Sequence, residues 1–315
     1  MENVKRFEQA VKTLPPRLSQ VLISLSDDEK NSVREICLRV GKAVVAVTEN
    51  GVRFICESGR LTQIYSSFAV QTDCREIEET FHRLCGYSVY SFKDAINRGF
   101  ITVDGGHRAG VGGTAVTENG RVTAVRDINC INLRIAREIK GAADGIVSRC
   151  FSDGVSGLIV AGPPSSGKTT VLRDIARQLS GGEKGIFAKV FVCDERGEIG
   201  AVHCGNPQND LGINCDLITS YPKNEGILIG LRSFSPDIII CDEIATEEEA
   251  EAVEAGLCSG VGFALSIHSG SEKELRSKPL LARLLRSGGF ENVVLLSGRK
   301  DGRVQRFFKA GELLD

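Results

Sequence analysis

Hydrophobic and polar positions follow two different patterns along this chain, and the change between them falls near residue 140. Before it, apolar residues recur at helical spacing over 4–14 and 77–84, and alternate with polar residues over 35–56 and 100–136. After it come short, wholly apolar runs such as "GLIVAG" (157–162) and "DIIICDE" (237–243). Alternation indicates strands with one solvated face, whereas continuous apolar runs between helices are typical of a parallel sheet covered on both faces.

The two patterns predict two domains. Residues 1–139 are expected to form a smaller mixed α+β domain, and residues 140–315 an α/β domain with a mostly parallel sheet. Within the first domain, "SDDE" (26–29) is a capping box that predicts the start of a helix. The stretch "ENG" (49–51) predicts the turn of a β-hairpin, and a second "ENG" (118–120) predicts a glycine turn.

Composition narrows the functional class. The chain has 315 residues and a net charge of −2, which excludes a broad basic surface for holding nucleic acid without sequence preference. Its eleven cysteines are scattered without a Cys-x-x-Cys pair, which favours reduced core thiols over disulfides or a metal centre. No apolar run approaches the roughly 18 residues of a membrane span. We therefore expect a cytoplasmic protein that binds no nucleic acid and has no membrane span.

The stretch "GPPSSGKTT" (162–170) has the spacing of a phosphate-binding loop, or P-loop, between an apolar strand and a helical run. Glycines let backbone N–H groups turn toward phosphate oxygens, and the helix N-terminus adds positive potential. Lys168 is expected to reach the β and γ phosphates, and the Thr169 hydroxyl to ligate Mg²⁺. The expected nucleotide-binding residues are Gly162, Pro163, Pro164, Ser165, Ser166, Gly167, Lys168, Thr169 and Thr170.

The stretch "SPDIIICDEI" (235–244) ends an apolar strand in two acids. Asp242 is expected to hold Mg²⁺, and Glu243 to orient and deprotonate an attacking water. A kinase needs no base for water, and the Asn-Lys-x-Asp or Thr-Lys-x-Asp stretch of a GTPase is absent. The pair therefore indicates hydrolysis; the alternative is two solvated acids at the end of a strand.

Two more apolar strands end in polar residues. "FVCDERGEIG" (191–200) ends in Asp194 and Glu195, and "ALSIHSGS" (264–271) contains His268. Ligands bind at the carboxyl edge of parallel strands, so Glu195 and His268 are expected near the nucleotide. An exposed acidic loop and a structural histidine are the respective alternatives.

In their order, these four stretches resemble the Walker A motif, Asp box, Walker B motif and His box of the secretion ATPase superfamily, which includes pilus motors and the ATPases of type II and type IV secretion. Three further stretches, 105–116, 131–144 and 221–261, are similar to a family within it that acts in endospore formation. The resemblance covers the chain from about residue 80 onward. One departure is that many secretion ATPases have Gly where this chain has Asp242, which favours direct contact of this residue with the metal.

The resemblance implies a RecA-like P-loop core that hydrolyses ATP with Mg²⁺, assembled as a homo-hexamer. It implies a peripheral location at the mother-cell side of the septal membrane. There the ring would energise a channel between mother cell and forespore, with membrane proteins of the same complex as partners. A nucleic-acid-associated P-loop ATPase and an ATP-gated assembly scaffold are the alternatives. Adenine is inferred from the resemblance and from the missing guanine motif.

The resemblance also gives a role to arginines of the first domain, because in this superfamily that domain closes over the nucleotide and its arginines face phosphates. The first choices are Arg108, Arg134 and Arg137, with surface salt-bridging as the alternative. Arg232, ahead of the second apolar motif, is a further candidate. The arginines that cluster before the boundary are Arg98, Arg108, Arg121, Arg126, Arg134 and Arg137.

Overall fold

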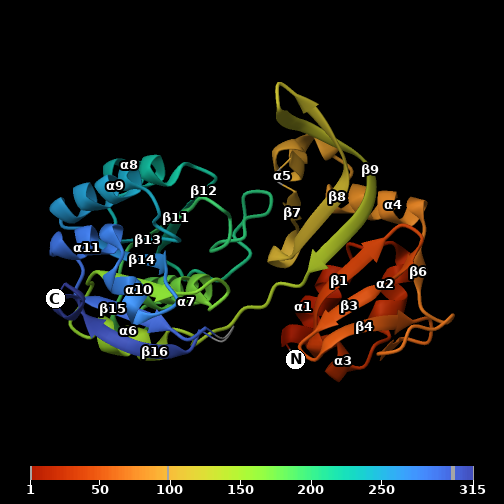
Figure 1. Ribbon diagram of the computed structural model, residues 1–315, viewed down its shortest axis with the longest axis horizontal. Helices are drawn as coiled ribbons and strands as arrows, with labels where there is room; N and C mark the ends of the chain where they lie inside the picture. Colours follow the sequence, from red (N-terminus) through yellow and green to blue (C-terminus); the bar gives the residue numbers. More distant parts are fainter. Residues whose placement is uncertain (1, 98, 299–301, 315) are drawn as a thin grey trace. The chain divides into compact units, whose positions relative to one another are not determined.

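The computed structural model describes residues 2–97, 99–298 and 302–314, and the chain divides into two compact units, seen with their elements in Figure 1. The first unit comprises Met1–Arg137 and His203–Gln208, and the second comprises Glu138–Val202 and Asn209–Asp315. Arg98 lies outside the described residues.

The segment His203–Gln208 packs with the first unit although the sequence around it builds the second. His203 Nδ1 lies 3.0 Å from the carbonyl oxygen of Thr102. The N–H of Gly105 donates a hydrogen bond of 2.7 Å to Oε1 of Gln208. These contacts hold the segment against residues 102–105 of the first unit.

The first unit is built on a seven-stranded antiparallel sheet. In spatial order its strands are β5 (Arg60–Thr62), β4 (Gly51–Cys56), β3 (Val45–Thr48), β1 (Val33–Arg39), β9 (Arg121–Arg134), β8 (Arg108–Glu118) and β7 (Phe100–Thr102). A two-strand ladder joins β2 (Lys42–Ala43) to β6 (Gln71–Thr72). The helices are α1 (Glu2–Val11), α2 (Pro16–Ile23), α3 (Asp27–Ser32), α4 (Cys74–Leu84) and α5 (Lys93–Asn97).

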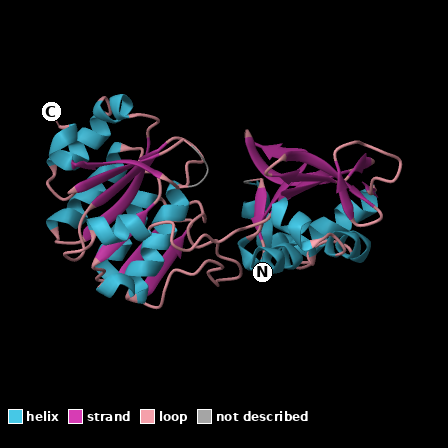
Figure 2. Cartoon of the chain, turned by 90° about the horizontal axis from the view of Figure 1, so that it is seen from below, coloured by secondary structure: helices cyan, strands magenta, loops and turns pink. Residues whose placement is uncertain are grey.

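One apolar core joins these helices to the sheet, and Figure 2 shows the helices gathered on one face of it. Phe7, Val11 and Leu14 are fully buried, so the helical spacing of the N-terminal segment does place one face in the core. Ser26 caps α3 in a capping box, which confirms the start predicted there. Asn119 and Gly120 both have positive φ, 51° and 75°, as the hairpin turn between β8 and β9 requires.

The second unit contains a seven-stranded sheet that is parallel except at one edge. Its strands are, in spatial order, β12 (Cys215–Thr219), β11 (Val190–Asp194), β13 (Ile238–Cys241), β14 (Gly262–His268), β10 (Leu158–Gly162), β15 (Asn292–Leu296) and the antiparallel β16 (Val304–Lys309). The helices are α6 (Asp144–Cys150), α7 (Lys168–Gly181), α8 (Lys223–Ser233), α9 (Glu247–Cys258), α10 (Glu272–Arg276) and α11 (Pro279–Arg286).

Helices cover both faces of this sheet (Figure 2), which explains why its strands are apolar throughout. Alternate residues of each strand enter two separate cores. Leu158 and Val160 pack with α6 and α7, whereas Ile159 and Ala161 belong to the core that contains α8, α9 and α11. The α/β fold with a mostly parallel sheet is therefore confirmed. The eleven cysteines are free thiols, and they are not all in the core as expected: five are buried, whereas Cys74, Cys204 and Cys258 are exposed.

Helix α8 lies unusually close to strand β11. A Cβ atom added at Gly226 would stand 2.4 Å from Sγ of Cys193, and one at Gly230 would stand 2.6 Å from the ring of Phe191. Real Cβ atoms do not approach other atoms so closely. The backbone of α8 can therefore lie this close to β11 only because both residues are glycines.

Candidate nucleotide-binding site

The P-loop leaves β10 at Gly162 and enters α7 at Lys168. Its turn uses left-handed backbone conformations at Ser165 (φ 61°) and Gly167 (φ 99°). The hydroxyl of Ser166 is buried and has no hydrogen-bond partner among the described residues. A loop with alternating backbone handedness at a helix N-terminus forms a concave set of N–H donors for anions. The residues present therefore fit a phosphate group.

Lys168 is almost fully buried in this loop, with 6% of its surface exposed. Its Nζ donates to the carbonyl oxygens of Gly162 (2.9 Å) and Pro163 (3.0 Å) and lies 3.1 Å from Nδ1 of His268. Burial lowers the pKa of Lys168, and the nearby carboxylates of Asp242 and Glu243 oppose that shift. A desolvated ammonium group gains strongly from an anionic ligand.

Asp242 stands directly after β13, next to the P-loop helix. The Thr169 hydroxyl donates a hydrogen bond of 2.6 Å to Oδ2 of Asp242. The other carboxylate oxygen, Oδ1, accepts a short hydrogen bond from the buried hydroxyl of Ser266. One hydroxyl and one carboxylate side by side are the protein ligands that Mg²⁺ uses at nucleotide sites, where phosphates and waters complete the shell.

Glu243 follows with its backbone in the left-handed region, at φ 44°. Its Oε1 lies 3.1 Å from Nε2 of His268, and Nη1 of Arg196 donates to its Oε2 at 2.6 Å. The His268 ring therefore lies between Glu243 and Lys168. The structure brings Lys168, Thr169, Asp242, Glu243 and His268 together at one sheet edge.

The carboxylate of Asp194, in the predicted Asp box, binds backbone N–H groups of the loop that follows it. Asp194 is buried, with 2% of its surface exposed, and accepts three backbone hydrogen bonds of 2.8–3.0 Å from the N–H groups of Glu198, Ile199 and Gly200. Burial raises the pKa of Asp194 although these hydrogen bonds favour its charged form. Its carboxylate folds the 195–200 loop back on itself. That loop carries Arg196, the partner of Glu243.

Glu195 lies 3.5 Å from Nζ of Lys223. Three residues of this site were not predicted from the sequence: Ser266, Arg196 and Lys223. Ser266 comes two positions before His268 in β14, so strand alternation gives both the same face and could have pointed to it. Arg196 lies in a loop and Lys223 is the first residue of a helix, so the hydrophobic periodicity of the sequence gives no signal for either.

The candidate arginines belong to the first unit. Arg108 and Arg134 stand directly opposite each other on β8 and β9, and the Arg108 guanidinium lies 4.6 Å from the Phe100 ring centre. Like charges directly opposite each other on neighbouring strands are unfavourable. Arg137 donates to the carbonyl oxygens of Asn31 and Val33, and burial lowers its pKa to about 10. Of the three arginines predicted to face the phosphates, Arg108 and Arg134 are therefore cross-strand neighbours. Arg137 is already hydrogen-bonded within the first unit.

Two other predicted arginines are placed as follows. Arg126 lies on β9 with its Nε 3.5 Å from the carboxylate of Asp127. Arg232 is exposed at the C-terminal end of α8, which leads into the start of β13. Asp242 follows the other end of that strand, so Arg232 lies at the opposite sheet edge and does not reach the phosphate site of its own chain.

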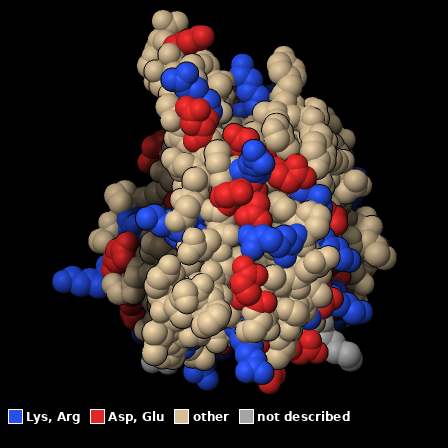
Figure 3. All heavy atoms as spheres, turned by 90° about the vertical axis from the view of Figure 1, so that its right-hand side faces the viewer, with Lys and Arg blue, Asp and Glu red and all other residues tan. Residues whose placement is uncertain are grey.

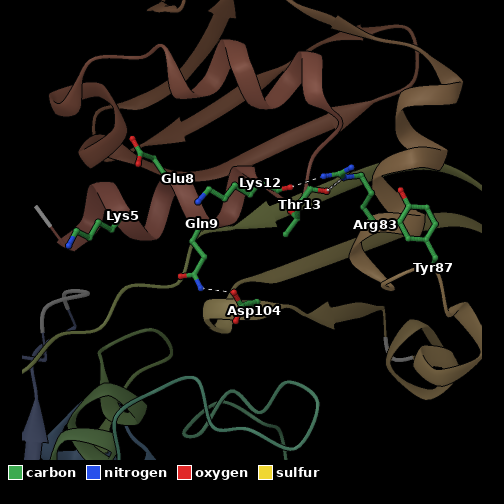
Figure 4. A pocket seen from close by; sticks show the side chains of 8 residues that line it. All are labelled: Lys5, Glu8, Gln9, Lys12, Thr13, Arg83, Tyr87 and Asp104. Atoms are coloured by element: carbon green, nitrogen blue, oxygen red, sulfur yellow. Dashed lines mark hydrogen bonds between the residues drawn. The ribbon is translucent and has the colours of Figure 1, made fainter.

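A separate open pocket of about 700 Å³ lies in the first unit, between α1, α4 and the turn at Asp104 (Figure 4). Gln9 donates to Asp104 at 2.8 Å across it, and Arg83 donates to the carbonyl oxygens of the two residues that follow α1, Lys12 and Thr13. Basic and acidic side chains both line the pocket. It contains no residue of the P-loop site.

Within 2–97, 99–298 and 302–314, no group of three or more His, Cys, Asp or Glu side chains is arranged to hold a metal ion. None of the helices in the same ranges combines the length and the hydropathy that a bilayer crossing demands.

Comparison with solved structures agrees with this fold. The ATPase DotB of Legionella pneumophila matches with a TM-score of 0.51 at 15% identity, over 84% of this chain and 72% of that one. The pilus retraction motor PilT, solved with bound ADP, matches with a TM-score of 0.52 at 14% identity, over 84% of this chain and 74% of that one. The second unit thus has the P-loop ATPase fold, and the candidate site residues lie at the carboxyl edge of its sheet.

The family is shown by sequence. Residues 4–313 match the family model described as sporulation stage III, protein AA, and the chain belongs to that family. Stage III sporulation protein AA of Bacillus subtilis (strain 168) is 32% identical over 311 residues, which is 98% of this chain and 97% of that protein.

Proposed function

We propose that this protein hydrolyses ATP to ADP and phosphate at the P-loop and uses the energy in endospore formation. The observation that supports it most is the continuous chain of contacts from Lys168 through His268 to Glu243, beside the Thr169–Asp242 pair. This arrangement joins a phosphate-binding ammonium, a metal-ligand pair and a carboxylate base within one sheet edge. Family membership supports the sporulation context.

In the proposed reaction, the P-loop N–H groups and Lys168 bind the β and γ phosphates, and Lys168 exchanges its carbonyl partners for phosphate oxygens. Mg²⁺ held by Thr169 and Asp242 would neutralise charge on the phosphates. Glu243 accepts the proton of the attacking water as that water bonds to the γ-phosphorus and the bond to ADP breaks. His268 keeps the Glu243 carboxylate beside the P-loop.

Phosphate release from purified full-length protein tests this proposal. Lys168→Ala and Glu243→Gln should each lower turnover by about 10²–10⁴-fold, since each removes a group that acts on the reacting phosphate. Glu243→Gln should still bind ATP. Glu225→Gln, an exposed glutamate on α8, is the matched control and should keep wild-type turnover. Full turnover in Glu243→Gln would refute the assignment of the base.

We further propose that the protein works as a homo-hexamer docked to membrane proteins of the same sporulation channel complex, at the mother-cell side of the septal membrane. Arg108 and Arg134 are the proposed arginines that stabilise charge on the γ-phosphate. Sedimentation with ATP and with ADP tests the assembly: a ring that forms with ATP but shows no turnover would indicate a scaffold. Turnover stimulated by single-stranded DNA or RNA would indicate a nucleic-acid-associated ATPase.

The surface does not favour the nucleic-acid alternative. On the face of the first unit seen in Figure 3, lysine and arginine side chains are interspersed with aspartate and glutamate. Proteins that hold nucleic acid without sequence preference present an extended surface of one sign. The mixed charges on this face suit a protein partner better.

A further inference from the structure

The backbone of Glu243 is held in an unfavourable conformation. At φ 44° it lies in the left-handed region, which costs a non-glycine residue about 1–2 kcal/mol. Such a conformation persists only where the surroundings fix it. The groups that fix it therefore decide where the carboxylate of the proposed base points.

Both peptide groups next to the Cα of Glu243 are bonded to side chains. Its N–H donates to Oγ of Ser266 at 2.8 Å, and its carbonyl oxygen accepts from Nζ of Lys223 at 2.6 Å. The next residue, Ile244, donates its N–H to the Ser266 carbonyl at 3.0 Å. With both sides fixed, the carboxylate is directed at His268, 3.1 Å away.

The side chain of Lys223 is buried and surrounded by acceptor oxygens. It is the first residue of α8, and only 6% of its surface is exposed. Besides the Glu243 carbonyl, its Nζ contacts the carboxylates of Glu249 (3.2 Å) and Glu195 (3.5 Å). Burying an ammonium group is costly unless such partners surround it. A lysine that only packed or only supported solubility would not be enclosed in this way.

Glu249 extends the same network to the end of the loop. Its Oε2 accepts hydrogen bonds from the N–H groups of Ala245 (2.7 Å) and Thr246 (3.1 Å), where α9 is capped. Lys223 therefore joins the Glu243 carbonyl at one end of the 243–246 loop to the acid that holds the other end.

We propose that Lys223 is a positioning residue: it holds Glu243 in the left-handed conformation that aims its carboxylate at the P-loop. This inference rests on the proposed ATP hydrolysis. The printed contacts of the Lys223 ammonium are the Glu243 carbonyl and the carboxylates of Glu249 and Glu195, so its loss should lower kcat and leave ATP affinity unchanged. Misplacing a reacting group by about 1 Å can cost about 10²-fold in rate, and a loss of that size is expected.

Lys223→Met in the full chain tests the proposal, because methionine keeps the apolar stem and removes the ammonium group. We expect kcat to fall about 10²-fold, with an unchanged Kd for a fluorescent ATP analogue. Lys189→Met is the matched control: Lys189 also donates to a backbone carbonyl, that of Phe234, but at the opposite sheet edge. It should keep wild-type kcat and Kd.

A second comparison separates positioning from general support of the fold. In a Glu243→Gln background, with residual rates measured at enzyme excess, Lys223→Met should cause no further loss, because Lys223 acts through the carboxylate already removed. A further loss of about 10²-fold there, or wild-type kcat in the single variant, would overturn the proposal. If Lys223→Met does not fold, Lys223→Gln carries the same expectations.

Failure of the proposed function is distinguishable from failure of this inference. If wild-type protein does not hydrolyse ATP, the function fails, and a crystal structure of Lys223→Met still tests the positioning. Residue 243 should then leave the positive-φ region and its carboxylate should move away from His268. An unchanged φ and an unchanged contact would overturn the role of Lys223 whatever the reaction.

Discussion

His107 offers a test of the first unit that is independent of any nucleotide. It is fully buried beside the turn at Asp104, and its Nδ1 accepts a hydrogen bond of 3.0 Å from the N–H of Ala136. Its Nε2 has no hydrogen-bond partner among the described residues. Burial lowers the pKa of His107 from 6.5 to about 4, with the charge of Arg6 adding to the shift and that of Asp104 opposing it.

The magnitude follows from these two values. In the unfolded chain the imidazole binds a proton near pH 6.5, but the folded protein resists protonation until about pH 4. The neutral histidine thus contributes stability that is fully present above pH 6.5 and is lost as the pH falls toward 4. At about 1.4 kcal/mol per pH unit, roughly 2 kcal/mol is lost between pH 6.5 and 5, and about 3 kcal/mol by pH 4.

The assay is urea unfolding of the full chain by circular dichroism at pH 7 and pH 5, for wild type and His107→Asn. Asparagine can keep an acceptor oxygen for Ala136 but does not titrate. Its variant should be less stable at pH 7, yet lose about 2 kcal/mol less than wild type on going to pH 5. His82→Asn, at an exposed histidine of α4, is the control and should keep the wild-type loss. Equal losses in wild type and His107→Asn would refute the reasoning.

Three further predictions concern the proposed site. Ser266→Ala should lower the free energy of unfolding, measured in urea, by about 1–3 kcal/mol, because Asp242 loses a buried hydrogen-bond donor. The control Ser259→Ala, at an exposed serine, should leave it unchanged. A Ser266→Ala variant as stable as wild type would contradict the importance of the Ser266–Asp242 hydrogen bond. Lys168→Met should abolish the rise in Tm caused by ATP without lowering Tm in its absence, since burial lowers the pKa of Lys168 and the fold gains little from its charge; a lower nucleotide-free Tm would show otherwise. Arg134→Ala should cut phosphate release at least about tenfold without destabilising the first unit, and unchanged release would exclude Arg134 from phosphate contact.

The sequence was most informative where local chemistry decides structure. The P-loop and the acids after β13 could be predicted because glycine spacing, an apolar strand and a following helix are all contiguous. The shared position of Glu243 and His268 needed one more rule, that parallel strands end at one edge. The buried role of Asp194 was not predicted, because nothing in "DERGEIG" shows that the loop turns back and covers its own carboxylate.

Contacts between distant segments escaped prediction for a different reason. Lys223 stands 20 residues before Glu243, and its reach depends on how low α8 lies over β11. The segment His203–Gln208 packs with the first unit although it follows a strand of the second. Neither the periodicity nor the charge of these stretches encodes such a partner, so only the folded arrangement reveals it.

The close approach of α8 to β11 limits which amino-acid substitutions this protein tolerates. Adding a single methyl group at position 226 or 230 would force the helix away from Cys193 or Phe191, and its first turn carries the ammonium that secures the base. Residues that have no side chain and meet no substrate would then govern the rate of the reaction. We expect a saturation survey of this chain to find inactive alleles at these two glycines as well as in the P-loop itself.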